Sequence, residues 1–194
     1  IYLVEYGRGP LARAITFFVD VMTGIPSIVA GLFAFAFFAL MFSDPGIRFG
    51  FGGSVALSLL MIPVVVRSSE EMLKIVPNEL REAAYALGVA KWRVVPKVVL
   101  RTAIAGITTG IMIALARVIG ETAPLLVTVG TATAVNNDPL DGRTATLPVL
   151  AYRFYAQGDY ERAWGAALVL VIIVMVLNLI ARWVSKTFAP KGGH

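Results

Sequence analysis

The chain has 194 residues, of which 58% are hydrophobic and only 15% are charged, whereas an average soluble domain has roughly 45–50% apolar and 25% charged residues. A soluble domain of this size cannot bury so much apolar surface, and the composition also excludes a disordered chain, so the sequence predicts an integral membrane protein. The net charge is +5 and cysteine is absent, which excludes a disulfide framework, a thiolate metal site and a cysteine nucleophile.

The sequence begins at Ile1, without a methionine and without a signal peptide. We therefore expect the chain to be a piece of a longer membrane protein, with further spans before Ile1. The one histidine, His194, is the last residue, so neither a catalytic histidine nor a metal site is expected. No soluble linker interrupts the sequence, which predicts a single transmembrane domain over residues 1–194.

Uncharged stretches predict four transmembrane helices, because an ionised side chain at the centre of a bilayer is costly and usually bounds a span. The predicted spans are about 11–42, 50–67, 102–126 and 163–182. Within the first span, the proline of Gly24-Ile25-Pro26-Ser27 removes a backbone donor, so a kink is expected there. The sequence therefore predicts an all-α polytopic transmembrane bundle.

The basic residues divide unevenly between the two sides of these spans. One side carries twelve lysines and arginines, namely Arg8 and Arg13 at the start of the first span, seven in 67–101 and three in 182–194; the other side carries four. By the positive-inside rule, the first side is cytoplasmic, which places the C-terminus there as well. The basic residues thus indicate membrane orientation, and no nucleic-acid partner is expected.

The loop over 68–101, between the second and third spans, is too long for a plain connector. Asn78 can cap a short helix that stops at Gly88, and a second short helix is expected from Ala90 through Val95, ended by Pro96. Two short helices that meet at a glycine form a compact elbow, which can transmit a push from a cytoplasmic partner to the spans.

Two ionisable residues, Arg117 and Glu121, lie inside the third span. Residues four apart share one face of a helix, so the two are expected to pair, in the outer half of the membrane. Intramembrane ionisable residues are functional more often than structural, but an ion pair that joins this helix to a neighbour is the alternative interpretation.

The loop resembles a known motif. Glu82-Ala83-Ala84, then Gly88 and later Pro96, are similar to the EAA loop in membrane subunits of bacterial ABC importers. The resemblance implies that the loop docks in a groove of an ATPase subunit, with Ala83 and Ala84 permitting close approach and Gly88 forming the bend. The alternative is an ordinary pair of interfacial helices.

Three further segments resemble one family of these importers, the phosphate-specific permeases of the A type. They are the segment from Ala116 to Leu125, the segment from Gly24 to Phe33, and Leu147-Pro148. The resemblance covers nearly the whole chain. It implies the fold of a type I ABC importer permease in the bacterial cytoplasmic (inner) membrane.

The same resemblance implies the partners. They are ATPase subunits, a second related permease that completes a heterodimer, and an extracytoplasmic phosphate-binding protein. The chain has no Gly-x-x-x-x-Gly-Lys-Ser/Thr motif, so it is not expected to be an enzyme or to hold a cofactor of its own. ATP and magnesium would be bound by the partner ATPase.

Within this family, Arg117 is expected to line the phosphate path, because its planar guanidinium suits a tetrahedral oxyanion. Glu121 would hold Arg117 in place and could accept the proton of monohydrogen phosphate while repelling sulfate, which has none at neutral pH. The alternatives are a permease for molybdate or sulfate, an ion channel or autonomous membrane receptor, and an intramembrane enzyme that relies on Glu121 and a few hydroxyls.

Overall fold

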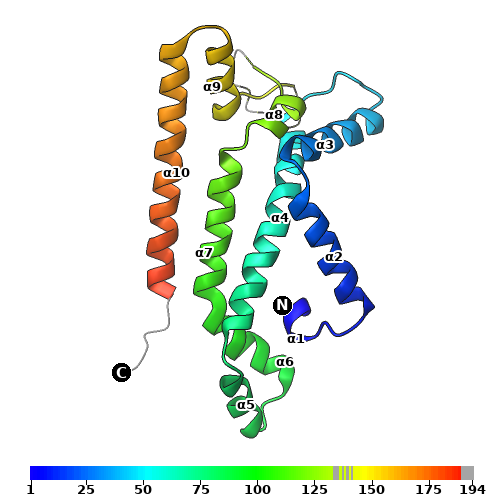
Figure 1. Ribbon diagram of the computed structural model, residues 1–194, viewed down its shortest axis with the longest axis vertical. Coiled ribbons are helices and arrows are strands. Elements are labelled where there is room, and N and C mark those ends of the chain that lie inside the picture. Colours follow the sequence, from blue (N-terminus) through cyan, green and yellow to red (C-terminus); the bar gives the residue numbers. More distant parts are fainter. Residues whose placement is uncertain (133–135, 137, 139, 141, 189–194) are drawn as a thin grey trace.

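The computed structural model describes residues 1–132, 136, 138, 140 and 142–188, apart from the side chains of 185–188. The C-terminal residues 189–194, whose side of the membrane was predicted from charge, lie outside the described residues. Within this described part every regular element is a helix, which confirms the expected all-α fold. The molecule is elongated, and its longest helices run side by side along its length (Figure 1).

Three helices of the described chain are long and apolar enough to cross a membrane, and a bent pair adds a fourth candidate. The bent pair is α2 (Pro10–Gly24) and α3 (Ser27–Met41), whose axes turn by 108° at the break between them. Ile25 is extended, with ψ 127°, as is usual for a residue before proline. The expected kink is therefore a sharp turn, and α3 runs across the long axis of the molecule near its upper end, on the side away from α10 (Figure 1).

The centre of the bundle is α4 (Gly50–Ile75), packed against α7 (Leu100–Ile119). Small residues allow the two helices to approach closely, because a Cβ added at Gly106 or Gly110 would overlap Met72 or Ser68 of α4. Arg67 of α4 forms ion pairs with Asp20 of α2 and with Glu70. The carboxylate of Asp20 is thus paired with a neighbouring helix.

The connection between α4 and the next long helix is shorter than the loop 68–101 that the uncharged stretches predict. It comprises 76–90 and contains α5 (Asn78–Ala86), after which α6 (Lys91–Val94), the π-helical segment η1 (Val95–Val99) and α7 follow without a break. Pro96 therefore does not end a helix, contrary to the sequence expectation. The wider π-helical turn accommodates its missing N–H, so one helix continues from 91 to 119.

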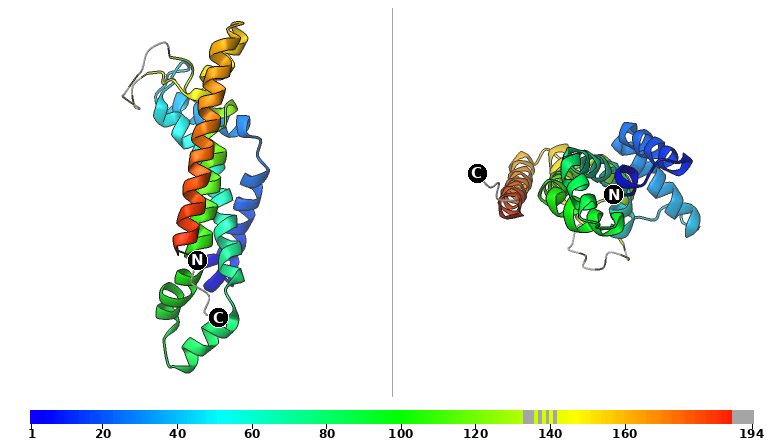
Figure 2. Two further views of the ribbon diagram at one scale, coloured as in Figure 1. Left: turned by 90° about the vertical axis from the view of Figure 1, so that its left-hand side faces the viewer. Right: turned by 90° about the horizontal axis from the view of Figure 1, so that it is seen from below.

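The remaining helices are α1 (Tyr2–Glu5), α8 (Ala123–Thr128), α9 (Leu147–Ala156) and α10 (Tyr160–Phe188). Seen from below, α10 lies at one side and α2 with α3 at the other, with α4 and α7 between them (Figure 2). Buried residues form a cluster at each end of the molecule. The lower cluster contains Leu73, Val76, Val94, Val99 and Ala103, and the upper one contains Leu125, Val129 and Val149.

Candidate functional site

A cavity of about 250 Å³ lies where the break between α2 and α3 meets α4 and the end of α7. This volume far exceeds the roughly 10–15 Å³ that a single water needs. The lining residues are Met22, Thr23, Ile25, Pro26, Ser27, Leu60, Pro63, Val64, Arg117, Val118 and Glu121. The cavity thus combines a broken helix, an internal proline of α4 and both ionisable residues singled out in the third span.

The N-terminus of α3 borders this cavity, because Pro26 and Ser27 belong to the lining. The first backbone N–H groups of a helix have no partner within it, and the helix dipole places partial positive charge at this end. Thr23 donates its hydroxyl proton to the carbonyl of Val19 at 2.7 Å, so its oxygen is oriented by α2. The broken helix therefore contributes donors and positive potential to the cavity wall.

Arg117 lies in the last turn of α7 and is exposed along the cavity. A cation is favoured at this position, because the carbonyl end of the helix dipole carries partial negative charge. Among the ion pairs of the described residues, none involves Arg117. Its guanidinium is therefore available to an anion in the cavity.

Glu121 lies outside the helix on which the sequence placed it. α7 ends at Ile119, with Gly120 as its C-cap, and the N–H of Glu121 donates to the carbonyl of Val118 at 3.1 Å in a tighter turn. The rule that residues four apart share a helix face therefore does not apply here. The two residues still line the same cavity, but no ion pair joins them in the described part of the chain.

Sequence reasoning did not assign Thr23, Ser27 or Pro63 to this site. The signal was present, since Pro26 follows the end of one apolar helix and Pro63 lies inside another. A broken helix in a membrane is tolerated where it lines a cavity. That the two prolines line the same cavity as Arg117 depends on helix packing, which the sequence does not show.

The residues expected to dock on an ATPase lie together at the lower end of the molecule. Glu82 and Ala83 of α5 are exposed, whereas Ala84 packs against the lower buried cluster. Gly88 has φ +75°, a left-handed conformation that favours glycine, and nothing lies within 4 Å of where its Cβ would be. The bend expected at Gly88 therefore requires glycine because of its left-handed backbone conformation, since there is room for a side chain at this position.

Comparison with known proteins shows close relatives. The chain is 51% identical to the phosphate transport system permease protein PstA of Mycobacterium leprae, a match that covers 92% of this chain and 59% of that protein. It is 41% identical to the PstA of Yersinia pestis, over 98% of this chain and 64% of that protein. The chain thus spans about three fifths of the length of these relatives, which confirm the resemblance to phosphate-specific permeases.

The fold also has a solved counterpart. A chain of the MetNI methionine ABC transporter in an inward-facing conformation superposes with a TM-score of 0.77, over 97% of this chain and 83% of that chain, at 21% identity. The model of the binding-protein-dependent transport system inner membrane components matches residues 2–192. The chain therefore belongs to the family of binding-protein-dependent transport system inner membrane components.

Proposed function

We propose that the chain forms part of the membrane path of an ATP-driven importer of inorganic phosphate, with Arg117 and Glu121 in the path. The observation that carries this proposal is the cavity, which brings an unpaired arginine to the N-terminus of a broken transmembrane helix. Discontinuous helices whose N-termini face an anionic substrate are a recurring design in transporters. The names of the relatives support phosphate as the anion.

Arg117 supplies the attraction for the anion. Its guanidinium presents several N–H donors in a planar fork, which suits two oxygens of a tetrahedral oxyanion. The free N–H groups at the start of α3 add donors without adding a charge that would retain the anion tightly.

Glu121 supplies discrimination between oxyanions. Its carboxylate can accept the proton of monohydrogen phosphate, whereas sulfate has no proton to give and would be repelled. The alternative interpretation of these two residues was an ion pair that holds helices together. The described ion pairs do not include it, which favours a role in the path.

The energy for transport comes from partner subunits in this proposal. The connection 76–90 docks on an ATPase subunit that binds ATP and magnesium. Glu82, Ala83 and Gly88 make the contact, and Ala84 lies where α5 packs against the lower buried cluster. A second, related permease completes the path, and an extracytoplasmic binding protein delivers phosphate. The excess of basic residues at the end that carries the connection supports a cytoplasmic location for it.

Competition between anions tests the substrate. The intact permease, reconstituted in vesicles with its ATPase and binding-protein partners, should import labelled phosphate only when ATP is supplied to the ATPase side. Excess unlabelled phosphate should abolish uptake of the label, whereas excess sulfate or molybdate should leave it unchanged. Equal competition by sulfate or molybdate would instead support a permease for another oxyanion, and uptake without ATP would support a channel.

Gly88→Val tests the docking of the connection. A left-handed conformation costs a residue with a side chain roughly 1–2 kcal/mol, which corresponds to a factor of about 5–30 in a conformational equilibrium. We expect ATP-dependent uptake to fall by about this factor, and co-purification of the ATPase subunit to weaken with it.

Gly158→Val is the matched control. Gly158 has φ +78° and an equally open surrounding, but it lies between α9 and α10 at the other end of the molecule. The same strain there should leave ATPase co-purification unchanged. If both variants lose the ATPase equally, the effect is general destabilisation and the docking role of Gly88 is wrong.

A further inference from the structure

The N-terminal segment contacts both α5, within the connection 76–90, and the first residue of α6, directly after it. Glu5, the last residue of α1, contacts Arg81 of α5 through its side chain and Lys91, the first residue of α6, through its backbone carbonyl. Glu5 is 76 positions from Arg81 and 86 positions from Lys91 in the sequence. We call this set the Glu5 clamp.

Arg81 forms the first arm of the clamp. Its Nη2 donates to Oε1 of Glu5 at 2.9 Å, and the two side chains are only 13% and 6% exposed. The same guanidinium donates to the carbonyls of Leu73 and Val76 at 3.0 and 2.5 Å, where α4 ends. Arg81 therefore satisfies carbonyls that the helix leaves free, and it holds α5 against the end of α4.

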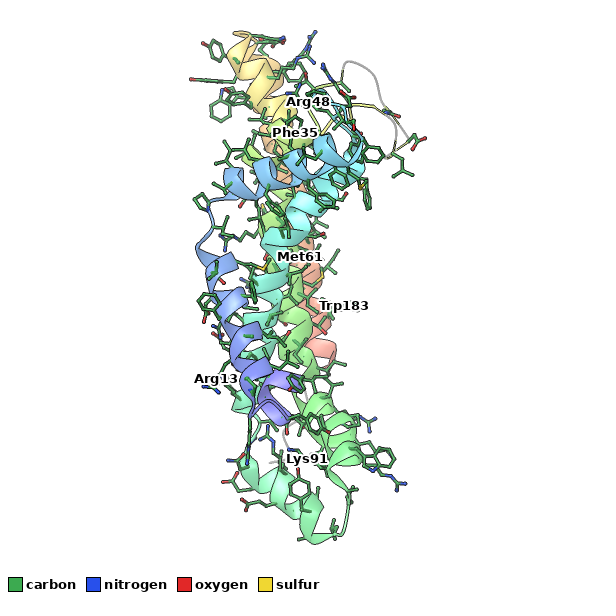
Figure 3. The ribbon with its side chains drawn as sticks, turned by 90° about the vertical axis from the view of Figure 1, so that its right-hand side faces the viewer. Arg13, Phe35, Arg48, Met61, Lys91 and Trp183 are labelled. Atoms are coloured by element: carbon green, nitrogen blue, oxygen red, sulfur yellow. The ribbon has the colours of Figure 1, made fainter. Side chains whose placement is uncertain are left out.

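Lys91 forms the second arm. Its Nζ donates to the backbone carbonyl of Glu5 at 2.5 Å and lies 4.8 Å from the ring centroid of Tyr6. The ammonium thus combines a hydrogen bond to the end of α1 with a cation–π contact. Lys91 lies toward the lower end of the molecule, beside the connection and the N-terminal segment (Figure 3).

A tight turn joins the clamp to α2. The N–H of Gly7 donates to the carbonyl of Tyr2 at 2.7 Å, and a Cβ on Gly7 would lie 2.8 Å from that of Ala12 in α2. The other end of α2 carries Met22 and Thr23, which line the cavity together with Arg117. The clamp, the turn at Gly7 and α2 therefore form a continuous series of contacts from the connection to the cavity.

We propose that Glu5 is a positioning residue that couples the connection 76–90 to α2. This inference rests on the proposed function, because it assigns to the connection a force supplied by an ATPase. The buried Glu5 carboxylate is the element that makes the coupling stiff, since an almost fully buried charge pair cannot separate without leaving one charge uncompensated. Movement of the connection therefore carries α1 with it.

The test uses Glu5→Gln in the intact permease assembled with its ATPase and binding-protein partners. Hydrogen exchange of the backbone amides in 76–90 and in α2 is measured with and without a non-hydrolysable ATP analogue. In the unmodified complex, the nucleotide should change exchange in both segments. In Glu5→Gln, the change in 76–90 should remain and the change in α2 should be lost.

The ratio of phosphate imported to ATP hydrolysed is a second measurement on the same variant. Phosphate imported per ATP hydrolysed should fall about tenfold, the factor expected for losing one charge-assisted hydrogen bond, while the ATPase still co-purifies. Glu71→Gln is the matched control, because it removes the same charge from an exposed position on α4. Glu71→Gln should match the unmodified complex in both readings.

Lys91→Met separates the two arms and provides a second variant should Glu5→Gln fail to assemble. It removes the ammonium but keeps an apolar chain of similar length, and the response of α2 to nucleotide should be weakened but not lost. A full α2 response in both variants overturns the coupling role of Glu5. Failure of the proposed function would look different. In that case the unmodified complex itself would not retain the ATPase or would not import phosphate. An unmodified complex in which nucleotide leaves α2 unchanged also overturns the coupling.

Discussion

Arg117→Ala should reduce ATP-dependent phosphate uptake by at least about a hundredfold, with normal amounts of assembled complex. The reason is that Arg117 is the one arginine among the cavity-lining residues of the described chain. Loss of two charge-assisted hydrogen bonds, each worth about 1.5–3 kcal/mol, leaves the anion with only the helix N-terminus and hydroxyls. Uptake by vesicles containing the intact permease and its partners measures the effect.

Two further arginine variants show whether the loss of uptake is specific to the guanidinium of Arg117. Arg117→Lys keeps the charge but loses the planar fork, so its uptake should lie between that of the unmodified protein and that of Arg117→Ala. Arg101→Ala removes an exposed arginine near the opposite end of α7 and should have no such effect. Uptake at the unmodified rate by an assembled Arg117→Ala complex would remove Arg117 from the path.

Gly31→Ala should destabilise the protein by about 1–3 kcal/mol, as overpacking commonly does. A Cβ at Gly31 of α3 would lie 2.5 Å from Cα of Pro124 in α8. Because this neighbour is backbone, rotation of a side chain cannot relieve the overlap, and α3 must move away from α8. A lower melting temperature of the purified protein measures the loss.

The displacement of α3 should also impair transport, since the N-terminus of α3 borders the cavity. Gly165→Ala in α10 is the control, because nothing lies within 4 Å of the Cβ that it would gain. Its melting temperature should be unchanged or slightly raised. Equal melting temperatures for both variants would show that the contact between α3 and α8 is more compliant than the structure indicates.

The Arg48 side chain shows how distant segments hold α3 in place at the upper end. Its Nε donates to the carbonyl of Val127 at 3.2 Å, and its guanidinium carbon lies 6.0 Å from the ring centroid of Phe35 in α3 (Figure 3). The N–H of Phe49 donates to the carbonyl of Thr128 at 3.1 Å. The orientation of α3 after its 108° turn is therefore stabilised by contacts with the segment around α8.

Local chemistry accounts for the features that sequence reasoning predicted. Apolar stretches bounded by charges predict helices that span a membrane, Pro26 predicts an interruption, and Gly88 predicts a bend. Each depends on residues close together in the chain. The motifs around Glu82 and Arg117 likewise indicated the family before any packing was known, because they are short and contiguous.

Tertiary structure decided the features that depend on contacts between distant residues. A helix continues through Pro96 in a π-helical turn. α7 ends at Ile119, two residues before Glu121. Neither feature could be predicted from the local sequence. The cavity draws on α2, α3, α4 and α7, and the Glu5 clamp joins residues 76 positions apart. Charge and periodicity along a sequence indicate which residues are costly to bury unpaired in lipid. Only the folded chain determines which residues they contact.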